Sequence, residues 1–124
     1  MSVKKLLDLS GKVALVTGGS RGLGLQIAEA LGEMGAKLAL SARKSDELAQ
    51  AKEHLQRMRL EVLTLPCDHS KAASIQPVIE NIVKHYGQID ILVNNAGATW
   101  GAPAEDHPLE AWEKVMDLNV TGLF

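Results

Sequence analysis

The feature that most constrains the fold of this chain is the stretch Thr17-Gly18-Gly19-Ser20-Arg21-Gly22-Leu23-Gly24. It follows the apolar run Val13-Ala14-Leu15-Val16 and opens a segment with helical periodicity, so it predicts a sharp turn between a buried strand and a helix. The first amides of a helix have no partner within the helix, and together with the helix dipole they attract an anion. Glycines in the turn let the anion approach the backbone closely. The stretch therefore predicts a phosphate-binding turn in an open α/β sheet.

The rest of the chain strengthens this interpretation, because a glycine-rich turn by itself is weak evidence. Apolar runs predict strands over 13–17, 37–41, 61–66 and 89–93. Helical periodicity predicts a helix after each of the first three strands and a last helix that begins at Pro108. This alternation predicts right-handed βαβ units and a parallel sheet, with the glycine-rich turn at the carboxyl end of its first strand.

Helix ends and buried helix faces also follow from the sequence. Ser45 and Ser70 are expected N-caps, and Gly35 and Gly87 are expected just past the ends of two helices. The faces expected to be buried are, helix by helix, Leu23, Ile27, Leu31 and Met34; Leu48, Ala51, Leu55 and Met58; Ile75, Val78, Ile79, Ile82 and Val83; and Leu109, Trp112 and Met116.

The composition favours a globular domain and argues against nucleic acid as a partner. With 46% hydrophobic residues, the chain has enough apolar material for a core. A net charge of −2 provides no basic stripe, and few aromatic side chains are present to stack on bases. Cys67 is the only cysteine, which excludes an internal disulfide and is typical of a reducing cytoplasm, where we expect the protein.

No targeting, membrane or metal signal stands out. Asp8 and Ser10 interrupt the N-terminal apolar segment, so it does not have the pattern of a signal peptide. No apolar run approaches the roughly 18 residues that a membrane-spanning helix requires. The histidines share no metal-ligand spacing, so no metal site is expected.

Four motifs occur in a fixed order: the turn Thr17-Gly18-x-x-x-Gly22-x-Gly24, Asp68 after the third strand, Asn94-Asn95-Ala96-Gly97 after the fourth, and Leu118-Asn119-Val120 in the last helix. With these motifs the chain resembles the classical type of the short-chain dehydrogenase/reductase family, from about Leu9 to Phe124. The resemblance implies a Rossmann-like doubly wound parallel sheet, here truncated to its first four strands and part of the following helix. Residues 1–124 would form the N-terminal part of a single NAD(P)-binding Rossmann domain.

The resemblance also implies roles for individual residues. The glycine turn would hold the pyrophosphate of a nicotinamide dinucleotide, Asp68 would accept a hydrogen bond from the adenine amino group, and His69 would contribute through its backbone. The residues expected to bind the cofactor are Gly18, Ser20, Arg21, Gly22, Leu23, Gly24, Arg43, Asp68, His69, Asn95 and Gly97. Two structural alternatives stay open: Asp68 could simply begin a turn before Ser70, and the paired asparagines could pin neighbouring strands.

The choice of cofactor follows from charge. Folds of this kind that bind NAD commonly place an Asp or Glu at the end of the second strand, where it repels a 2′-phosphate. Here that end reads Ser41-Ala42-Arg43-Lys44, without an acid. Arg43 can form a forked pair with a phosphate, and Arg21 can approach from the other side, so the sequence favours NADP over NAD. The alternative is that Arg43 and Lys44 are solvated charges in a loop.

Asn119 is the one catalytic residue that the resemblance places in this chain. In relatives, an Asn at this position keeps a helix locally open and holds a water in a proton relay to a Lys. The alternative is an Asn that competes with its own backbone for hydrogen bonds. The family's catalytic Ser, which follows a fifth strand, and its Tyr-x-x-x-Lys are missing. The only tyrosine, Tyr86, is followed by Gly87-Gln88-Ile89-Asp90, with no Lys four residues later.

Two functions are therefore open. The first is the N-terminal portion of an NADP-dependent oxidoreductase that interconverts a secondary alcohol and a carbonyl in a small-molecule substrate of the sugar-acid or 3-oxoacyl type. The second is a truncated, catalytically inactive nucleotide-binding fragment. Family members are about twice this length by resemblance, so we expect an exposed apolar edge at the fourth strand and poor folding of the chain alone. A homo-oligomer is expected only of the full-length enzyme.

Three apolar side chains have less specific roles. Cys67 is expected to fill space at a strand end, and Trp112 to be a core residue of its helix. Trp100, in the loop after Gly97, is a candidate for the substrate side.

Overall fold

A computed structural model describes residues 2–98 and 101–124. The elements follow one another in the order α1 (Val3–Leu6), β1 (Val13–Thr17), α2 (Gly22–Glu33), β2 (Lys37–Ala42), α3 (Ser45–Arg57), β3 (Val62–Pro66), η1 (Ala72–Ser74), α4 (Ile75–Tyr86), β4 (Ile91–Val93), η2 (Ala104–Asp106), α5 (Leu109–Met116) and η3 (Asp117–Thr121).

The four strands form one parallel sheet in the order β3-β2-β1-β4. Strand β1 lies in the interior, where Leu15 is in register with Ala39 of β2 on one side and with Leu92 of β4 on the other. Because all strands are parallel, their carboxyl ends lie at the same edge of the sheet. The predicted parallel α/β sheet is confirmed, and β1 has the predicted bounds.

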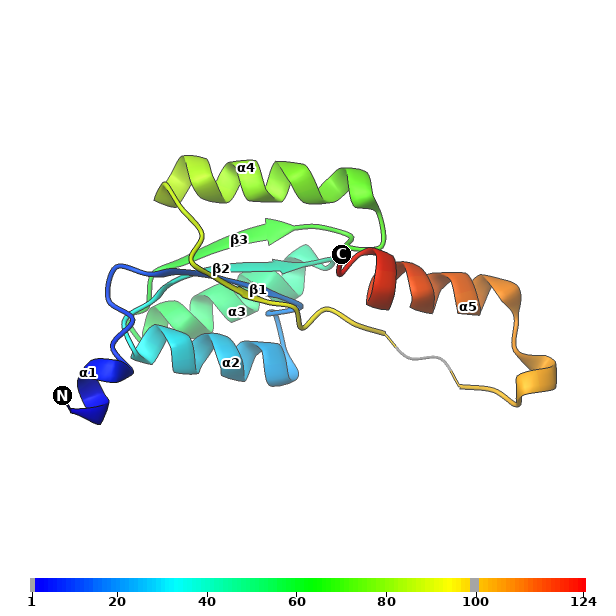
Figure 1. Ribbon diagram of the computed structural model, residues 1–124, viewed down its shortest axis with the longest axis horizontal. Coiled ribbons are helices and arrows are strands. Elements are labelled where there is room, and N and C mark those ends of the chain that lie inside the picture. Colours follow the sequence, from blue (N-terminus) through cyan, green and yellow to red (C-terminus); the bar gives the residue numbers. More distant parts are fainter. Residues whose placement is uncertain (1, 99–100) are drawn as a thin grey trace.

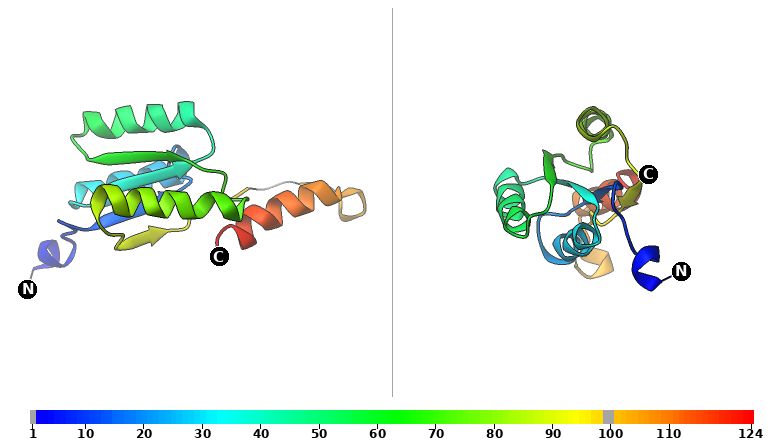
Figure 2. Two further views of the ribbon diagram at one scale, coloured as in Figure 1. Left: turned by 90° about the horizontal axis from the view of Figure 1, so that it is seen from above. Right: turned by 90° about the vertical axis from the view of Figure 1, so that its left-hand side faces the viewer.

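The two faces of the sheet have separate cores. Ala14 and Val16 of β1 pack in the core that includes residues of α2 and α3, whereas Val13 and Leu15 pack with residues of α4. Figures 1 and 2 show the same layers, with α4 on one side of the sheet and α2 and α3 on the other. Burial on both faces explains why β1 is apolar at consecutive positions.

Helix α5 lies beyond the carboxyl ends of the strands and leads the chain back toward the sheet (Figure 1). At its end, Gly122 packs directly against the carbonyl of His69, in the segment that follows β3, and a Cβ at this glycine would collide with that oxygen. The chain after α5 is therefore in contact with the carboxyl edge of the sheet.

Both predicted N-caps are wrong. The N-cap of α3 is Lys44, so Ser45 already has its place within the helix. Helix α4 begins at Ile75 after the turn of η1, and the Ser70 hydroxyl instead donates a hydrogen bond of 2.6 Å to Oδ1 of Asp68. Ser70 therefore bonds to the neighbouring Asp68 side chain and does not cap the helix that the sequence pattern assigned to it.

The sheet's edge strand is shorter than predicted. Strand β4 begins at Ile91 rather than 89, because the Asp90 carboxylate, not a strand carbonyl, accepts the hydrogen bond from the Val13 amide, at 2.9 Å. Strand β3 begins at Val62 rather than 61. Leu92 of β4 is 56% exposed, in agreement with the expected apolar edge.

Several side chains on the predicted buried faces are exposed. The face of α3 is correct for Leu48, Ala51 and Leu55. The prediction is wrong for the exposed residues Leu23, Met34, Ile79, Val83, Leu109 and Trp112. Trp112 is 56% exposed because α5 projects past the end of the sheet, with no layer over that face in the described residues.

Trp100 lies outside the described residues. Within the described ranges, no helix is both long and apolar enough to cross a bilayer.

Candidate functional site

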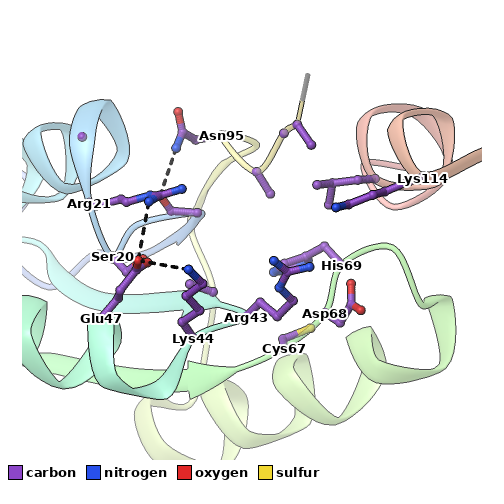
Figure 3. A pocket seen from close by; sticks show the side chains of 17 residues that line it. Ser20, Arg21, Arg43, Lys44, Glu47, Cys67, Asp68, His69, Asn95 and Lys114 are labelled. Carbon is purple, nitrogen blue, oxygen red and sulfur yellow. Dashed lines mark hydrogen bonds and ion pairs between the residues drawn. The ribbon is translucent and has the colours of Figure 1, made fainter. Parts of the chain in front are cut away.

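A cleft of about 580 Å³ lies at the carboxyl edge of the sheet, with the segments after all four strands and part of α5 and η3 around it (Figure 3). This size is within the range of small-molecule sites. The residues that line it are Gly18, Ser20, Arg21, Gly22, Ala42, Arg43, Lys44, Glu47, Cys67, Asp68, His69, Asn95, Ala96, Gly97, Ala98, Lys114 and Leu118.

The glycine turn is fixed to the segment that follows β4. The Thr17 hydroxyl oxygen accepts hydrogen bonds of 3.0 Å from the amides of Asn95 and Ala96, and Nδ2 of Asn95 donates a bond of 3.1 Å to the Gly18 carbonyl. Gly18 has a φ of +64°, and a Cβ there would lie 3.1 Å from Cα of Ala96. These bonds agree with the structural alternative for the paired asparagines, because Asn95 ties the glycine turn to the segment after β4.

The N-terminus of α2 is left without a side-chain cap. Arg21 is its N-cap residue, and its side chain makes no capping hydrogen bond. The first-turn amides of α2 have no acceptor within the helix. Gly24 packs so closely on the Gly18 carbonyl that a Cβ there would overlap its oxygen. The turn therefore presents amides to the cleft through a close backbone contact that a side chain would prevent.

Four cationic side chains line the cleft, Arg21, Arg43, Lys44 and Lys114, together with two carboxylates, Glu47 and Asp68. Glu47, in the first turn of α3, is 3.5 Å from Arg21 and 3.8 Å from Lys44, and it accepts a hydrogen bond of 3.4 Å from the Ser20 hydroxyl. Figure 3 shows these three partners around Glu47, with Lys114 on the opposite wall. Arg43 makes no salt bridge with any residue that the structure describes. Arg43 and Lys114 are thus the two lining cations without a salt bridge in the described residues, and the positive charge of Arg43 helps to lower the pKa of nearby Asp68.

Asp68 and His69 form the wall after β3. The Asp68 carboxylate accepts bonds from the Ser70 hydroxyl and amide, and the hydroxyl bond chiefly keeps the pKa of Asp68 below its usual value. Both bonds go to Oδ1, in agreement with the structural alternative that Asp68 begins a turn before Ser70, and Asp68 also lines the cleft. His69 is buried with its Nε2 2.7 Å from the Ser41 hydroxyl, and burial lowers the pKa of its imidazole despite the opposing charge of Asp68.

Asn119 lies in the wide π-helical turn η3 and clamps a neighbouring segment. Its Oδ1 accepts a hydrogen bond of 2.9 Å from the Ala98 amide, and its Nδ2 donates one of 2.6 Å to the Ala98 carbonyl. The helix is thus locally widened at Asn119, as expected, and π-helical turns are frequent at functional sites. The side chain bonds to another segment, not to its own helix.

The structure brings most of the predicted cofactor-binding residues together at the cleft. Of that set, Gly18, Ser20, Arg21, Gly22, Arg43, Asp68, His69, Asn95 and Gly97 line it. Leu23 does not, since its side chain points to solvent and is 65% exposed, and Gly24 acts from behind the turn. Asn119 also lies outside the lining and contacts it through Ala98.

Sequence reasoning missed Glu47, Lys44, Lys114 and Leu118 as lining residues. Glu47 follows Lys44 by one helical turn, a spacing that predicts an ion pair but not its place beside Ser20 and Arg21.

Tyr86 lies outside the cleft: its hydroxyl donates to the Leu38 carbonyl at 2.9 Å, and burial raises its pKa to about 12. This tyrosine is structural. In the described residues, no group of three His, Cys, Asp or Glu side chains could hold a metal ion.

A parallel sheet of this strand order, with a glycine-rich turn at the carboxyl end of β1, defines a Rossmann-like α/β domain. The family model for short chain dehydrogenase matches residues 12–124, and the chain belongs to that family.

Individual relatives agree with this assignment. The rhamnolipids biosynthesis 3-oxoacyl-[acyl-carrier-protein] reductase of Pseudomonas aeruginosa is 42% identical over 94% of the chain. The solved RhlG/NADP active-site complex of Pseudomonas aeruginosa has a TM-score of 0.89 and is 42% identical over 95% of the chain. A solved NAD+-bound xylitol dehydrogenase has a TM-score of 0.90 and is 33% identical over 94% of the chain.

The chain spans about half the length of these proteins. It covers 45% of the reductase, 46% of the RhlG chain and 45% of the xylitol dehydrogenase chain. The match therefore supports the family and the fold for this part of the protein.

Proposed function

We propose that this chain is the N-terminal, nucleotide-binding portion of an NADP-dependent oxidoreductase that interconverts a secondary alcohol and a carbonyl. The observation that carries the proposal is the cleft itself. It joins the N-terminus of α2, which has no side-chain cap, to the guanidinium of Arg43, which forms no salt bridge within the described part of the chain. The helix N-terminus suits a pyrophosphate, and the guanidinium suits a further phosphate.

The lining residues fit a nicotinamide dinucleotide along its length. The amides of α2 would face the pyrophosphate, and Asp68, whose Oδ1 accepts from Ser70, would accept from an adenine amino group through Oδ2. Asn95 and Gly97 would lie along the ribose. The RhlG/NADP complex supports NADP, whereas the NAD+-bound xylitol dehydrogenase supports NAD, so the similar structures alone leave the choice open. The unpaired Arg43 leads us to favour NADP.

The bound nicotinamide would supply the hydride, and this chain would bind and orient it. Fixing the turn to the segment after β4 would give the cofactor one position relative to the substrate side. Asn119 would act by holding the Ala98 segment in place beside that position. Proton transfer needs a Ser and a Tyr-x-x-x-Lys from residues that this sequence does not contain.

We propose a substrate of the sugar-acid or 3-oxoacyl type. The 3-oxoacyl-[acyl-carrier-protein] reductase supports the 3-oxoacyl type, and the xylitol dehydrogenase supports a sugar-derived substrate. We propose a cytoplasmic enzyme and, for the full-length protein, a homo-oligomer. A second function, nucleotide binding without catalysis, is favoured by the absence of a tyrosine at the cleft among the described residues.

Two experiments test the proposal. In the coding DNA, an in-frame Tyr-x-x-x-Lys downstream of codon 124 is expected, and a stop codon at that point would favour the inactive fragment. In solution, NADPH fluorescence titration should show saturable binding to the chain, with weaker binding of NADH. Failure to bind either nucleotide by the folded chain would overturn the proposal.

A further inference from the structure

The carboxylate of Glu47 is the least expected group at the cleft. It lies beside Arg21 and Lys44, two of the cations that border the proposed site for the additional phosphate. The Glu47 side chain is 24% exposed, against 77% for Arg21 and 55% for Lys44. The acid is thus the inner member of the group, and the two cations extend over it toward solvent.

The three contacts of Glu47 hold it from different segments. Ser20 and Arg21 belong to the turn after β1, whereas Lys44 precedes α3. The Ser20 hydroxyl donates to Oε2, and both cations approach Oε1. Glu47 therefore lies between the glycine turn and the end of β2, with partners on both sides.

This position matters for the choice between NADP and NAD. A negative side chain near the end of the second strand disfavours a 2′-phosphate, and the sequence has none at 41–44. Glu47 supplies such a negative charge from the first turn of α3, which follows β2. It also pairs with Arg21 and Lys44, so that of these three neighbouring cations only Arg43 makes no salt bridge with the described residues.

We propose that Glu47 is a specificity-determining residue that limits the preference of this site for NADP over NAD. It acts through Arg21 and Lys44, by pairing with them, and through direct repulsion of a 2′-phosphate. The inference rests on the proposed function, because it requires that the cleft bind a nicotinamide dinucleotide.

The test is the ratio of NADH to NADPH dissociation constants for the wild-type chain and for Glu47→Gln. Glutamine keeps the size of the side chain and an oxygen for Ser20, but removes the charge. We expect NADPH affinity to rise at least about fivefold while NADH affinity stays within about twofold, and this gain to shrink at high salt. Glu47→Asp, which keeps the charge, should retain a ratio close to that of the wild type.

The matched control is Glu53→Gln, on the same helix, whose carboxylate pairs with Arg57 away from the cleft. It should leave the ratio unchanged. A ratio that is unchanged in Glu47→Gln, or an equal loss of affinity for both nucleotides, would overturn the specificity role while leaving the proposed function in place. A folded wild-type chain that binds neither nucleotide would instead overturn the proposed function, and the inference with it.

Discussion

Asn119 and Ala98 are joined by a pair of hydrogen bonds in which the amide side chain of Asn119 satisfies both backbone groups of Ala98. The pair ties η3 to the segment that follows β4, across the cleft edge. A residue with an expected catalytic role thus also has a clear structural one. The two roles make different predictions.

Replacing Asn119 with alanine should destabilise the chain by about 1–3 kcal/mol, because the Ala98 amide and carbonyl lose their partners in a partly buried place. Urea unfolding followed by circular dichroism measures the change. Asn94→Ala is the control, since Asn94 is exposed, and a change within about 0.5 kcal/mol is expected there. Equal stability of both variants would mean that the clamp contributes nothing.

Gly24→Ala should also be destabilising, by about 3 kcal/mol or more, although alanine is normally the better helix former. The new Cβ would overlap the Gly18 carbonyl oxygen, which belongs to the backbone of the turn and accepts a hydrogen bond from Asn95. Gly101→Ala, where a Cβ meets nothing within 4 Å, is the control and should be nearly neutral. The measurement is again the urea midpoint; a stabilised Gly24→Ala variant would contradict the close packing.

His69 should make the stability of the chain depend on pH near neutrality. Burial lowers its pKa in the folded state below the usual value of 6.5, so the unfolded chain takes up a proton first as the pH falls. This contribution to stability is complete above pH 6.5 and is lost progressively below it. Comparing unfolding at pH 7.5 and 5.5, His69→Gln should lose less stability than the wild type. The same pH dependence in both proteins would show that His69 does not cause it.

Arg43→Ala should weaken NADPH binding by at least about tenfold and leave NADH binding nearly unchanged, because a charge-assisted pair to the 2′-phosphate is lost. Arg57→Ala is the control, since Arg57 pairs with Glu53 outside the cleft. Fluorescence titration of both reduced nucleotides measures the effect. If NADPH and NADH bound Arg43→Ala with the same relative affinities as the wild type, Arg43 would have no part in cofactor choice.

The sequence was a good guide where short-range patterns determine structure. The apolar run of β1 has its predicted bounds, and the glycine turn lies at the carboxyl end of β1 as predicted, because both follow from neighbouring residues. Prediction from the sequence failed where a side chain's environment depends on other parts of the structure. Ser70 was expected to cap a helix but bonds to Asp68, and Trp112 was expected to be buried but lies on a helix that extends beyond the sheet.

The same limit explains why Glu47 was missed as a site residue. Ser20 and Glu47 are separated by 27 positions, and only the fold of the first βαβ unit brings them within hydrogen-bond distance. No spacing rule connects them. The residues at the end of β2, 41–44, therefore include no acid, although the Glu47 carboxylate lies beside Arg21 and Lys44.

The most direct test of the central claim is a crystal structure of this chain grown with NADP. We predict the pyrophosphate at the amides of the first turn of α2, behind Gly22, and the 2′-phosphate within hydrogen-bond distance of Arg43. Density for the nucleotide away from the glycine turn, or a cleft filled by the protein's own side chains under saturating NADP, would contradict the account.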